Sequence, residues 1–428
     1  MSKKNRNKKE TWHKKIKMNN IEKLITELCP NGVEFKTLLE LGYFYGGLTG
    51  KNKNDFSNGN AKFITYMNVF SNIAVNINIT DFVKIGENEN QNKVELGDVL
   101  FTGSSETPEE CGMSSVLTEQ TDEPLYLNSF CFGFRLNDKT MFLPDFLKYL
   151  FRCDNLRKQI TQTASGVTRF NVSKNRMEKV LIPIPPIEIQ AHISNILDKF
   201  TELEAELEAE LETRKKQYEY YRDNLMVNDK WLMVSLGEVA NVQSGGTPAK
   251  TKSEYWENGS IEWLGSTVCK NQKSVEEITD FITELGLKNS SAKILPKRTT
   301  LIAMVGATIG KVAFLDFDAT TNQNVAALYP KNTNELNPDY LFYACQKLYD
   351  KFTSLANGKL AMANLSFIKK LEIPLPPLAV QNRIVSILDK FDKLVNDISE
   401  GLPAEIKMRR QQYEYYRNKL LNFETLKN

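Results

Sequence analysis

Histidine and paired cysteine are the scarcest features of this 428-residue chain. It has only two histidines, His13 and His192, so a histidine-rich metal site is excluded. Its six cysteines are scattered, without a Cys-x-x-Cys pair. Free thiols in a reducing compartment fit this spacing better than a disulfide framework does, and we therefore expect a cytoplasmic protein.

Long apolar runs and a strong net charge are also missing. No stretch approaches the length of a membrane span, and no signal-peptide pattern opens the chain, so we expect no membrane partner. The formal net charge is only +2, so any contact with nucleic acid must come from local basic patches. With 41% hydrophobic and 25% charged residues, the composition is that of an ordinary soluble protein, long enough for two or three domains.

A basic segment opens the chain. Residues 2–17 hold eight lysines and arginines against one acid, Glu10. We interpret residues 1–18 as a disordered basic tail.

The most informative feature that is present is an internal repeat. The hexapeptide Gln-Tyr-Glu-Tyr-Tyr-Arg occurs twice, at residues 217–222 and 412–417. Ahead of each copy stand an Ile-Pro-x-Pro-Pro string and then a glutamine, Gln190 or Gln381. A long period whose best-matched part is helical indicates two similar units joined by similar arms. Such a protein presents one surface twice, related by a rotation, which suits the twofold symmetry of duplex DNA.

The duplication covers roughly residues 19–226 and 230–423. Outside the arms the two copies share the order of their motifs more than their identity, and the Gly-Gly pair at 46–47 aligns with the pair at 245–246. Short β-type runs and one proline-started helix are expected in each copy, so we predict two mixed α+β domains with a shared fold and divergent surfaces. The segments that carry this prediction are the strands Val99–Thr102, Leu301–Val305 and Lys311–Leu315 and the helices Pro144–Phe151 and Pro338–Lys351.

The two arms, which follow the proline-rich strings, have apolar residues at spacings of three and four. This pattern predicts amphipathic helices, with the first running from Ile187 to Leu225. The second arm contains Gly401 and Pro403, which indicate a helix that stops and restarts. Two such helices in one chain most simply bury their apolar stripes against each other. We expect an antiparallel coiled coil that separates the two globular domains and relates them by a pseudo-twofold axis.

These features together resemble the specificity (S) subunits of type I restriction–modification systems. The proline-rich junctions with their glutamines, the Glu-Leu-Glu-Ala tetrads of residues 202–213 and the repeated hexapeptide are similar to the conserved regions of that family. The segment at 245–248, Gly-Gly-Thr-Pro, is similar to the start of its target recognition domains, although the first copy has Gly-Gly-Leu-Thr at 46–49. The resemblance divides the chain into target recognition domain 1 at 19–180, conserved helical region 1 at 181–229, target recognition domain 2 at 230–371 and conserved helical region 2 at 372–428.

The resemblance implies a non-catalytic subunit that gives a restriction–modification complex its sequence specificity. Each target recognition domain would read one half of a bipartite site in double-stranded DNA. The implied partners are two modification (M) subunits, which use S-adenosylmethionine, and two restriction (R) subunits, which use ATP and Mg²⁺. This chain would scaffold them and would itself hold no cofactor and no metal. The alternatives are a coiled-coil adaptor whose globular ends bind proteins and a self-contained DNA enzyme.

Motifs for an independent enzyme are missing. The segments 46–52 and 306–312 each fall one residue short of a Gly-x-x-x-x-Gly-Lys phosphate loop and lack the Ser or Thr that would hold Mg²⁺. The chain also has no Asn-Pro-Pro-aromatic motif for methyl transfer. We therefore expect no catalytic residue in this chain.

Candidate binding residues fall into two groups. Six cations lie in loops rich in small polar residues, which suit contacts with phosphates and base edges, although ordinary solvated surface should account for about half of them. The candidate DNA-binding residues are Lys51, Lys53, Arg169, Lys250, Lys252 and Lys359. Tyrosine serves both in helix packing and at exposed interfaces, so the doubled tyrosine clusters are candidates for partner contact. The candidate partner-binding residues are Tyr218, Tyr221, Tyr413 and Tyr416.

Overall fold

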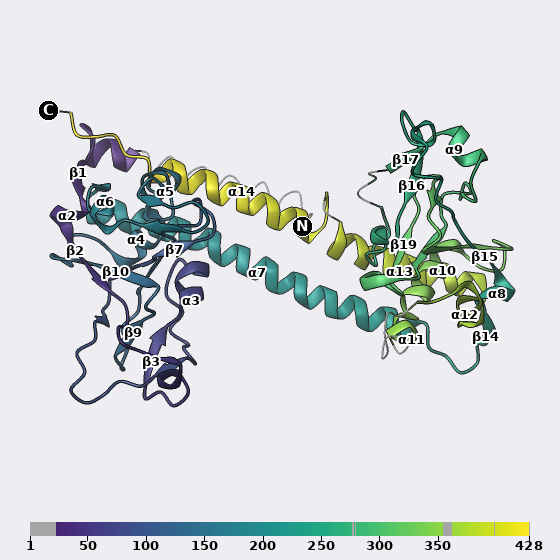
Figure 1. Cartoon of the computed structure of the whole chain (residues 1–428), viewed down its shortest axis with the longest axis horizontal. Helices are drawn as coiled ribbons and strands as arrows, with labels where there is room; N and C mark the ends of the chain where they lie inside the picture. Colours follow the sequence, from purple (N-terminus) through teal and green to yellow (C-terminus); the bar gives the residue numbers. More distant parts are fainter. Residues whose placement is uncertain (1–22, 276–277, 279, 354–361, 398, 428) are drawn as a thin grey trace. The chain divides into compact units, whose positions relative to one another are not determined.

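The computed structural model describes residues 23–275, 278, 280–353, 362–397 and 399–427 (Figure 1). The predicted basic tail, residues 1–18, lies outside this part of the chain. Two compact units are present: unit 1 comprises Met1–Ala205 and Met408–Asn428, and unit 2 comprises Glu206–Lys407. Each unit therefore combines one globular domain with parts of both arms.

The globular domain of unit 1 is a mixture of strands and short helices. Its elements in chain order are β1 (Glu34–Thr37), α2 (Leu38–Leu41), β2 (Gly42–Gly46), the 3-10 turn η1 (Lys53–Phe56), β3 (Ala61–Ile64), α3 (Tyr66–Ser71), β4 (Phe82–Val83), β5 (Lys93–Val94), β6 (Val99–Thr102), β7 (Ser104–Ser105), β8 (Ser114–Val116), β9 (Leu125–Leu127), β10 (Cys131–Leu136), α4 (Pro144–Leu150), α5 (Asp154–Thr161), β11 (Ala164–Ser165), β12 (Phe170–Val172), α6 (Lys174–Met177) and β13 (Leu181–Ile184).

Two four-stranded sheets form the body of this domain. The antiparallel sheet β2-β10-β6-β8 lies beside α4, α5 and α6, and every residue of β6 is buried, which explains its continuous rather than alternating apolar run (Figure 1). The second sheet, β4-β3-β9-β5, lies at the end of the domain away from these helices and contains one parallel pair, β3 with β9. A small third sheet, β11-β12-β7, carries a tight hairpin.

Unit 2 repeats this plan. Its elements are β14 (Leu232–Ser235), α8 (Leu236–Val239), β15 (Ala240–Ser244), η2 (Ser253–Tyr255), β16 (Ile261–Leu264), η3 (Ser266–Val268), β17 (Asp280–Ile282), α9 (Glu284–Lys288), β18 (Thr300–Ala303), η4 (Gly306–Thr308), β19 (Val312–Phe314), β20 (Thr320–Thr321), β21 (Val325–Pro330), α10 (Pro338–Gln346), α11 (Tyr349–Thr353), α12 (Leu365–Lys370) and β22 (Glu372–Leu375).

Two sheets of unit 2 follow the strand order of two sheets of unit 1, although the second has three strands where unit 1 has four. The antiparallel sheet β15-β21-β18-β19 corresponds to β2-β10-β6-β8, and β17-β16-β20 corresponds to β4-β3-β9, again with one parallel pair. The prediction of two similar α+β domains is therefore confirmed. The three strands predicted from sequence are β6, β18 and β19, each within two residues.

One predicted helix is shorter than expected. The helix predicted to run from Pro338 to Lys351 ends at Gln346, and α11 begins three residues later. At this end the Gln346 amide is buried and accepts the hydroxyl of Tyr218 at 3.1 Å, while it donates to the carbonyl oxygen of Asn271 at 2.8 Å.

The proline-rich strings are extended, as predicted, but they are also paired. β13 is antiparallel to β1, with Pro183 opposite Phe35, and β22 is antiparallel to β14, with Pro374 opposite Met233. Each ladder has only two strands, so a residue without an N–H donor is tolerated. The first strand of each domain thus pairs with the proline-rich strand through which the chain leaves that domain.

The contacts of the glutamine after each proline-rich string explain why both copies have this residue. Gln190 Nε2 donates to the carbonyl oxygen of Pro185 at 2.8 Å, and its Oε1 accepts the N–H of Leu143 at 2.9 Å. Gln381 makes the same two bonds with Pro376 and Asn337, both at 2.8 Å. Both glutamines are fully buried. They link the residue just before α4 or α10 to the proline-rich segment at the end of the domain.

The arm helices are those predicted. α7 (Ile187–Leu225) is unbroken, whereas the second arm is divided into α13 (Leu378–Asn396) and α14 (Leu402–Leu420). A Cβ atom on Gly401 would lie 2.6 Å from the carbonyl oxygens of Asp397 and Lys393, so glycine permits the break. Pro403 then occupies the second position of α14, which suits a restart.

Within each unit the two arms pack through matching aromatic pairs. In unit 1, Phe200 of α7 stacks on Tyr416 of α14 at a centroid distance of 5.4 Å, and Arg410 donates to Glu204. Rising numbers on α7 thus meet falling numbers on α14, which is the antiparallel direction. In unit 2 the roles of the arms exchange, and Tyr221 stacks on Phe391 at 5.1 Å.

Candidate nucleic-acid interface

Each globular domain has a glycine where its first long strand ends. Gly46 and Ser244 are the last paired residues of β2 and β15, so Gly47 corresponds to Gly245. A Cβ atom on Gly47 would lie 2.1 Å from the nearest backbone carbonyl oxygen, and one on Gly245 would lie 1.8 Å from it. Glycine is required for this close approach. The alignment of 46–47 with 245–246 is therefore wrong by one position.

The loop that faces this glycine has the same turn in both domains. The side chain of Asn128 accepts the backbone N–H of Phe130 at 2.8 Å, and that of Asn322 accepts the N–H of Asn324 at 2.9 Å. Such a turn fixes the residue that follows it. In unit 1 that residue is an aromatic ring, 59% exposed, and in unit 2 it is a small amide. The turn is shared, but the side chain that follows it differs, with Phe130 exposed and Asn324 half-buried.

Arg169 lies on the hairpin between β11 and β12, and its guanidinium group lies over the ring of Phe130, which precedes β10. β12 also pairs with β7, which anchors the hairpin to the domain. Gly166 has a φ of +152°, and a Cβ atom there would lie 2.0 Å from the carbonyl oxygen of Arg169. Glycine therefore lets the loop close tightly beneath the arginine.

The guanidinium group of Arg169 is held on two sides. Its Nε donates to Ser104 Oγ at 3.1 Å, and its Cζ lies 5.8 Å from the centroid of the Phe130 ring. No carboxylate of the described residues pairs with it. The two terminal nitrogens, Nη1 and Nη2, are thus presented on an exposed side chain.

A second cation near this hairpin was not singled out from sequence. Lys174 is the first residue of α6, and its Nζ lies 5.4 Å from the centroid of the Phe132 ring. Phe132 is two residues beyond Phe130, so both cations lie over rings from one short stretch of chain. The signal for Lys174 is its place directly after the Asn-x-Ser triplet that the two copies share.

The other two candidates in unit 1 have different environments. Lys51 is largely buried, with its side chain 9% exposed, and its Nζ lies 2.5 Å from Glu89. The Gly86 N–H, Lys51 and Gln91 together lower the pKa of Glu89 to about 2. Lys53 opens the turn η1 and is exposed.

In unit 2 the candidates lie in the loop after β15. Lys250 is exposed. Lys252 is also exposed, but its Nζ donates to the hydroxyl of Tyr255 at 3.0 Å, and this bond raises the pKa of the lysine. Lys359 lies outside the described residues. The structure therefore places Lys250 and Lys252 together, in the loop that follows the shared glycine.

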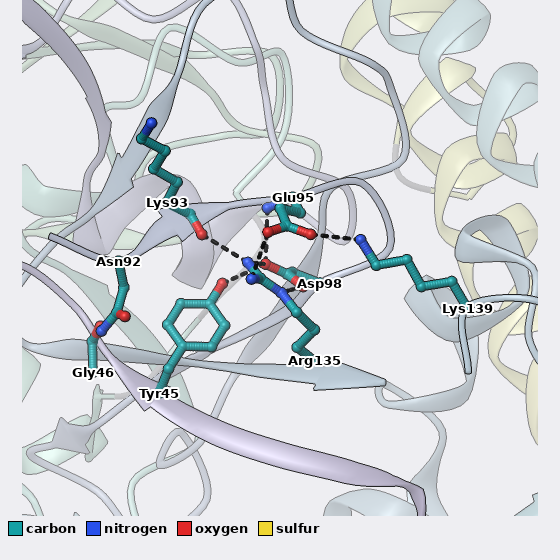
Figure 2. A network of polar contacts seen from close by, with 8 residues as sticks. All are labelled: Tyr45, Gly46, Asn92, Lys93, Glu95, Asp98, Arg135 and Lys139. Carbon is teal, nitrogen blue, oxygen red and sulfur yellow. Dashed lines mark hydrogen bonds and ion pairs between the residues drawn. The ribbon is translucent and has the colours of Figure 1, made fainter. Parts of the chain in front are cut away.

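Other arginines of unit 1 are used inside the domain. Figure 2 shows Arg135 bound to both carboxylate oxygens of Asp98, at 2.9 and 2.7 Å, and to Glu95 at 2.6 Å. The hydroxyl of Tyr45 donates to the same buried aspartate at 2.6 Å, and Lys139 donates to Glu95 (Figure 2). This network joins the sheet of β2, β10 and β6 to β5 of the second sheet, and Arg135 is not available to a ligand.

Two further arginines bind backbone carbonyl groups. Arg152 donates to the carbonyl oxygens of Ser114 and of three residues at the end of α3, and burial lowers its pKa to about 10. Arg157 donates to carbonyl oxygens in the loop before β8. Both arginines stabilise loops of the domain.

The four candidate tyrosines take part in packing within the units. Tyr218 is 6% exposed, and Tyr221 stacks on Phe391 as described above. Tyr413 packs edge-on against Tyr149 at 6.3 Å, and Tyr416 stacks on Phe200.

The most exposed tyrosines of the two hexapeptides are Tyr220 and Tyr415, with 64% and 60% of their surface exposed, whereas Tyr221 is 40% exposed. The most exposed tyrosine is therefore the same position in both copies of the hexapeptide. Sequence reasoning named the clusters but did not separate the buried tyrosines from the exposed ones.

No candidate metal-binding group is found in the described part of the chain. Residues 23–275, 278, 280–353, 362–397 and 399–427 contain no group of three or more His, Cys, Asp or Glu side chains that could hold a metal ion. The same residues contain no helix long and apolar enough to cross a membrane. The lysine of the loop at 46–52 is paired with Glu89, and the loop at 306–312 begins with the 3-10 turn η4.

Comparison with known families gives two matches along the chain. The family described as type I restriction modification DNA specificity domain matches residues 30–213 and again residues 228–408. The specificity subunit of the type I restriction enzyme EcoR124I/EcoR124II from Escherichia coli is 39% identical over 267 residues. That match covers 59% of this chain and 65% of the relative, so the chain spans slightly less than two thirds of the relative's length.

Solved structures match over almost the whole chain. The S subunit of a type I restriction–modification system from M. genitalium aligns with a TM-score of 0.53 and 16% identity, covering 92% of this chain and 97% of that one. A chain from a study of complex assembly and conformational transition in the type I restriction–modification system aligns with a TM-score of 0.65 and 18% identity, covering 91% and 98%. At such identities the likeness is one of fold.

Proposed function

Because the chain belongs to the family of type I restriction–modification DNA specificity subunits, which are non-catalytic, we propose that it reads a bipartite site in double-stranded DNA. The globular domain of unit 1 reads one half-site and that of unit 2 reads the other. The observation that carries this proposal is the shared turn that presents Phe130 in one domain and Asn324 in the other. A framework kept twice with a different side chain at the turn suits two half-sites of different sequence.

The exposed loop cations are the proposed DNA contacts. Arg169 and Lys53 in unit 1 and Lys250 and Lys252 in unit 2 are exposed, which suits contacts with phosphates or bases. Lys51 is a weaker candidate, because its ion pair with Glu89 would have to break before it could bind DNA. Lys359 stays a candidate on its sequence alone.

We also propose that the arms hold the other subunits of the complex. The exposed Tyr220 and Tyr415 occupy equivalent places on the two arms, so the same kind of partner would bind at two equivalent surfaces. A surface that is present twice supports two copies of the partner that binds it, and we propose two M and two R subunits for each chain. The M subunits would supply S-adenosylmethionine and the R subunits ATP and Mg²⁺, in the cytoplasm, while this chain binds no cofactor.

A domain exchange tests independent reading of the half-sites. Residues 231–365 would be replaced by the matching segment of a relative with a different target, and the methylated motif would be determined by methylome sequencing. We expect one half-site to change and the other to stay. If both halves of the motif change together, independent reading is wrong.

A binding assay separates this proposal from the protein-binding adaptor. The chain would be assembled with its M subunits and mixed with duplexes that do or do not carry the methylated motif. We expect tighter binding to the motif, with an affinity that falls as salt rises. Equal affinity for all duplexes, with assembly intact, would favour the adaptor.

A further inference from the structure

The hairpin of unit 1 places over an exposed aromatic ring an arginine that pairs with no carboxylate of the described residues. The Arg169 guanidinium lies over Phe130, which is 59% exposed, and its Nε donates to Ser104 Oγ. Val167 at the tip of the same hairpin is 91% exposed. An apolar tip and an exposed ring on a loop fixed by Gly166 mark a surface that is completed by a ligand.

We infer that Arg169 reads a guanine in the half-site of unit 1 and that Phe130 is its positioning residue. This inference rests on the proposed function and adds a named contact to it. Arginine is the side chain that pairs with the O6 and N7 atoms of guanine through two parallel hydrogen bonds. Because Nε is already bound to Ser104, the edge formed by Nη1 and Nη2 is the one that meets the base.

The ring beneath the arginine limits the orientations of its guanidinium group. Cζ lies over Phe130 and Nε is bound to Ser104, and bidentate recognition of a base edge depends on orientation. Arginine also binds phosphate through two parallel hydrogen bonds, so sensitivity to the N7 atom of guanine, and not affinity alone, identifies a base contact. Val167, two residues before Arg169 on the same hairpin, is an exposed apolar group of the kind that contacts a thymine methyl.

Lys174 serves as the internal contrast. It is a single ammonium group over the buried ring of Phe132, which is 3% exposed. A point charge with rotatable donors suits a phosphate. The two cations of one surface thus have separate roles, Arg169 for sequence and Lys174 for affinity.

The test uses the chain assembled with its M subunits and duplexes in which each guanine of the unit 1 half-site is replaced by 7-deazaguanine, which lacks the N7 acceptor. One such replacement should weaken binding by the native chain about tenfold. Arg169→Met, which has no donor for N7, should weaken binding to the unmodified site about 10-fold to 100-fold, and the same replacement should then have little further effect. Phe130→Leu should show the same loss of sensitivity with an unchanged melting temperature.

Two matched variants complete the experiment. Arg176→Met changes an exposed arginine of α6 that lies over no aromatic ring of the described residues, and its sensitivity to 7-deazaguanine should equal that of the native chain. Lys174→Met should weaken binding to all duplexes and lower the salt dependence by about one unit. If Arg169→Met retains full sensitivity to 7-deazaguanine, or if the unit 1 half-site has no guanine, the inference is overturned while the proposed function stands. Loss of all sequence preference in the native complex would instead overturn the proposed function.

Discussion

The two units use the same contact where arm and globular domain meet. In unit 1 the hydroxyl of Tyr149 donates to Asp198 at 2.6 Å, and in unit 2 the hydroxyl of Tyr343 donates to Asp389 at 2.6 Å. Both tyrosines lie five residues after the proline that starts their helix, and both aspartates belong to the repeated Ile-Leu-Asp-Lys-Phe segment. The arm is therefore fixed to each domain by one repeated geometry.

The lysine that neutralises each of these aspartates comes from a different element. In unit 1 it is Lys148 of α4, which lies 2.8 Å from Asp198. In unit 2 it is Lys273, from the loop after η3, which pairs with Asp389 and with Asp339. Both units therefore place a lysine beside this aspartate, although the lysine lies on a different element in each unit.

The units differ more where their two sheets meet. Unit 1 has the charged network of Asp98 and Arg135 (Figure 2), whereas Thr299 and Tyr329 occupy these positions in unit 2. The Thr299 hydroxyl donates to the carbonyl oxygen of Pro296 at 2.6 Å and needs no ionic partner. One sheet junction thus depends on charge and the other does not.

The largest expected effect comes from breaking the charged junction. Arg135→Tyr leaves the carboxylate of Asp98, which is 1% exposed, without its partner. We expect a loss of about 3–5 kcal/mol in the free energy of unfolding of unit 1. Combining it with Asp98→Thr installs the residues of unit 2 and should recover more than half of that loss. Denaturant unfolding of the intact chain measures both.

A surface variant is the control for this comparison. Lys139→Ala removes the 51% exposed lysine that binds Glu95 at the edge of the same network and should cost less than about 1 kcal/mol. If the double variant is no more stable than Arg135→Tyr alone, the two junctions are not interchangeable solutions.

The next effect tests what the units share. Gln190→Leu and Gln381→Leu each remove a buried amide and leave backbone groups without partners. Each should cost about 2–4 kcal/mol, and the two losses should agree within about 1 kcal/mol, because the contacts are the same. A clearly unequal pair would contradict the equivalence of the two junctions. Gln159→Ala, which removes bonds to the Leu181 backbone at a more exposed place, should cost about 1 kcal/mol.

A smaller effect comes from one methyl group in β10. A Cβ atom on Gly133 would lie 2.1 Å from Cζ of Tyr45, the ring that reaches Asp98. Gly133→Ala should therefore cost about 2 kcal/mol in unit 1. Unit 2 already has Ala327 at this place, opposite Gln243, and Ala327→Gly should cost about 1 kcal/mol. A cost below about 0.5 kcal/mol for Gly133→Ala would show that the ring moves freely.

The elements predicted well from sequence are those whose signal is local. The arm helix Ile187–Leu225 and the break at Gly401 follow from apolar spacing and from glycine and proline, and both are observed. The pairing of the proline strings with β1 and β14 is a contact between distant segments, and no local pattern shows it. The repeated glutamine was visible in the sequence, but its role as a buried clamp depends on which carbonyl groups surround it.

The candidate site shows the same limit. Arg169 could be named from its loop, because a cation among small polar residues is a local pattern. Its ring, Phe130, lies 39 positions away in the sequence, and Lys51 looks like Lys53 until Glu89 is seen beside it. The buried Tyr218 and the exposed Tyr220 belong to one hexapeptide, and only the packing of the helix separates them.

The smallest effect, and the one with a pH signature, concerns Asp392. It follows Phe391 in the arm, where unit 1 has Thr201 after Phe200. Burial, followed by the nearby Asp389 and Asp397, raises the pKa of Asp392 above its ordinary value, although a hydrogen bond from Asn396 and the charge of Lys273 act in the opposite direction. Unit 2 therefore holds a carboxyl group that is easier to ionise in the unfolded chain than in the folded one.

The sign of the effect follows from linkage. A raised carboxyl pKa leaves stability intact below the unfolded pKa of about 4 and reduces it as pH rises through the folded pKa. Asp392→Asn keeps the acceptor for Asn396 and removes the ionisation, so it should raise the melting temperature of unit 2 at pH 7 and have no effect near pH 3. Asp397→Asn is the matched control, because bonds from Ser399 and Glu400 lower the pKa of Asp397, and that variant should not be stabilised at pH 7. Thermal scans at both pH values decide the matter, and equal melting temperatures for native and Asp392→Asn chains at pH 7 would contradict it.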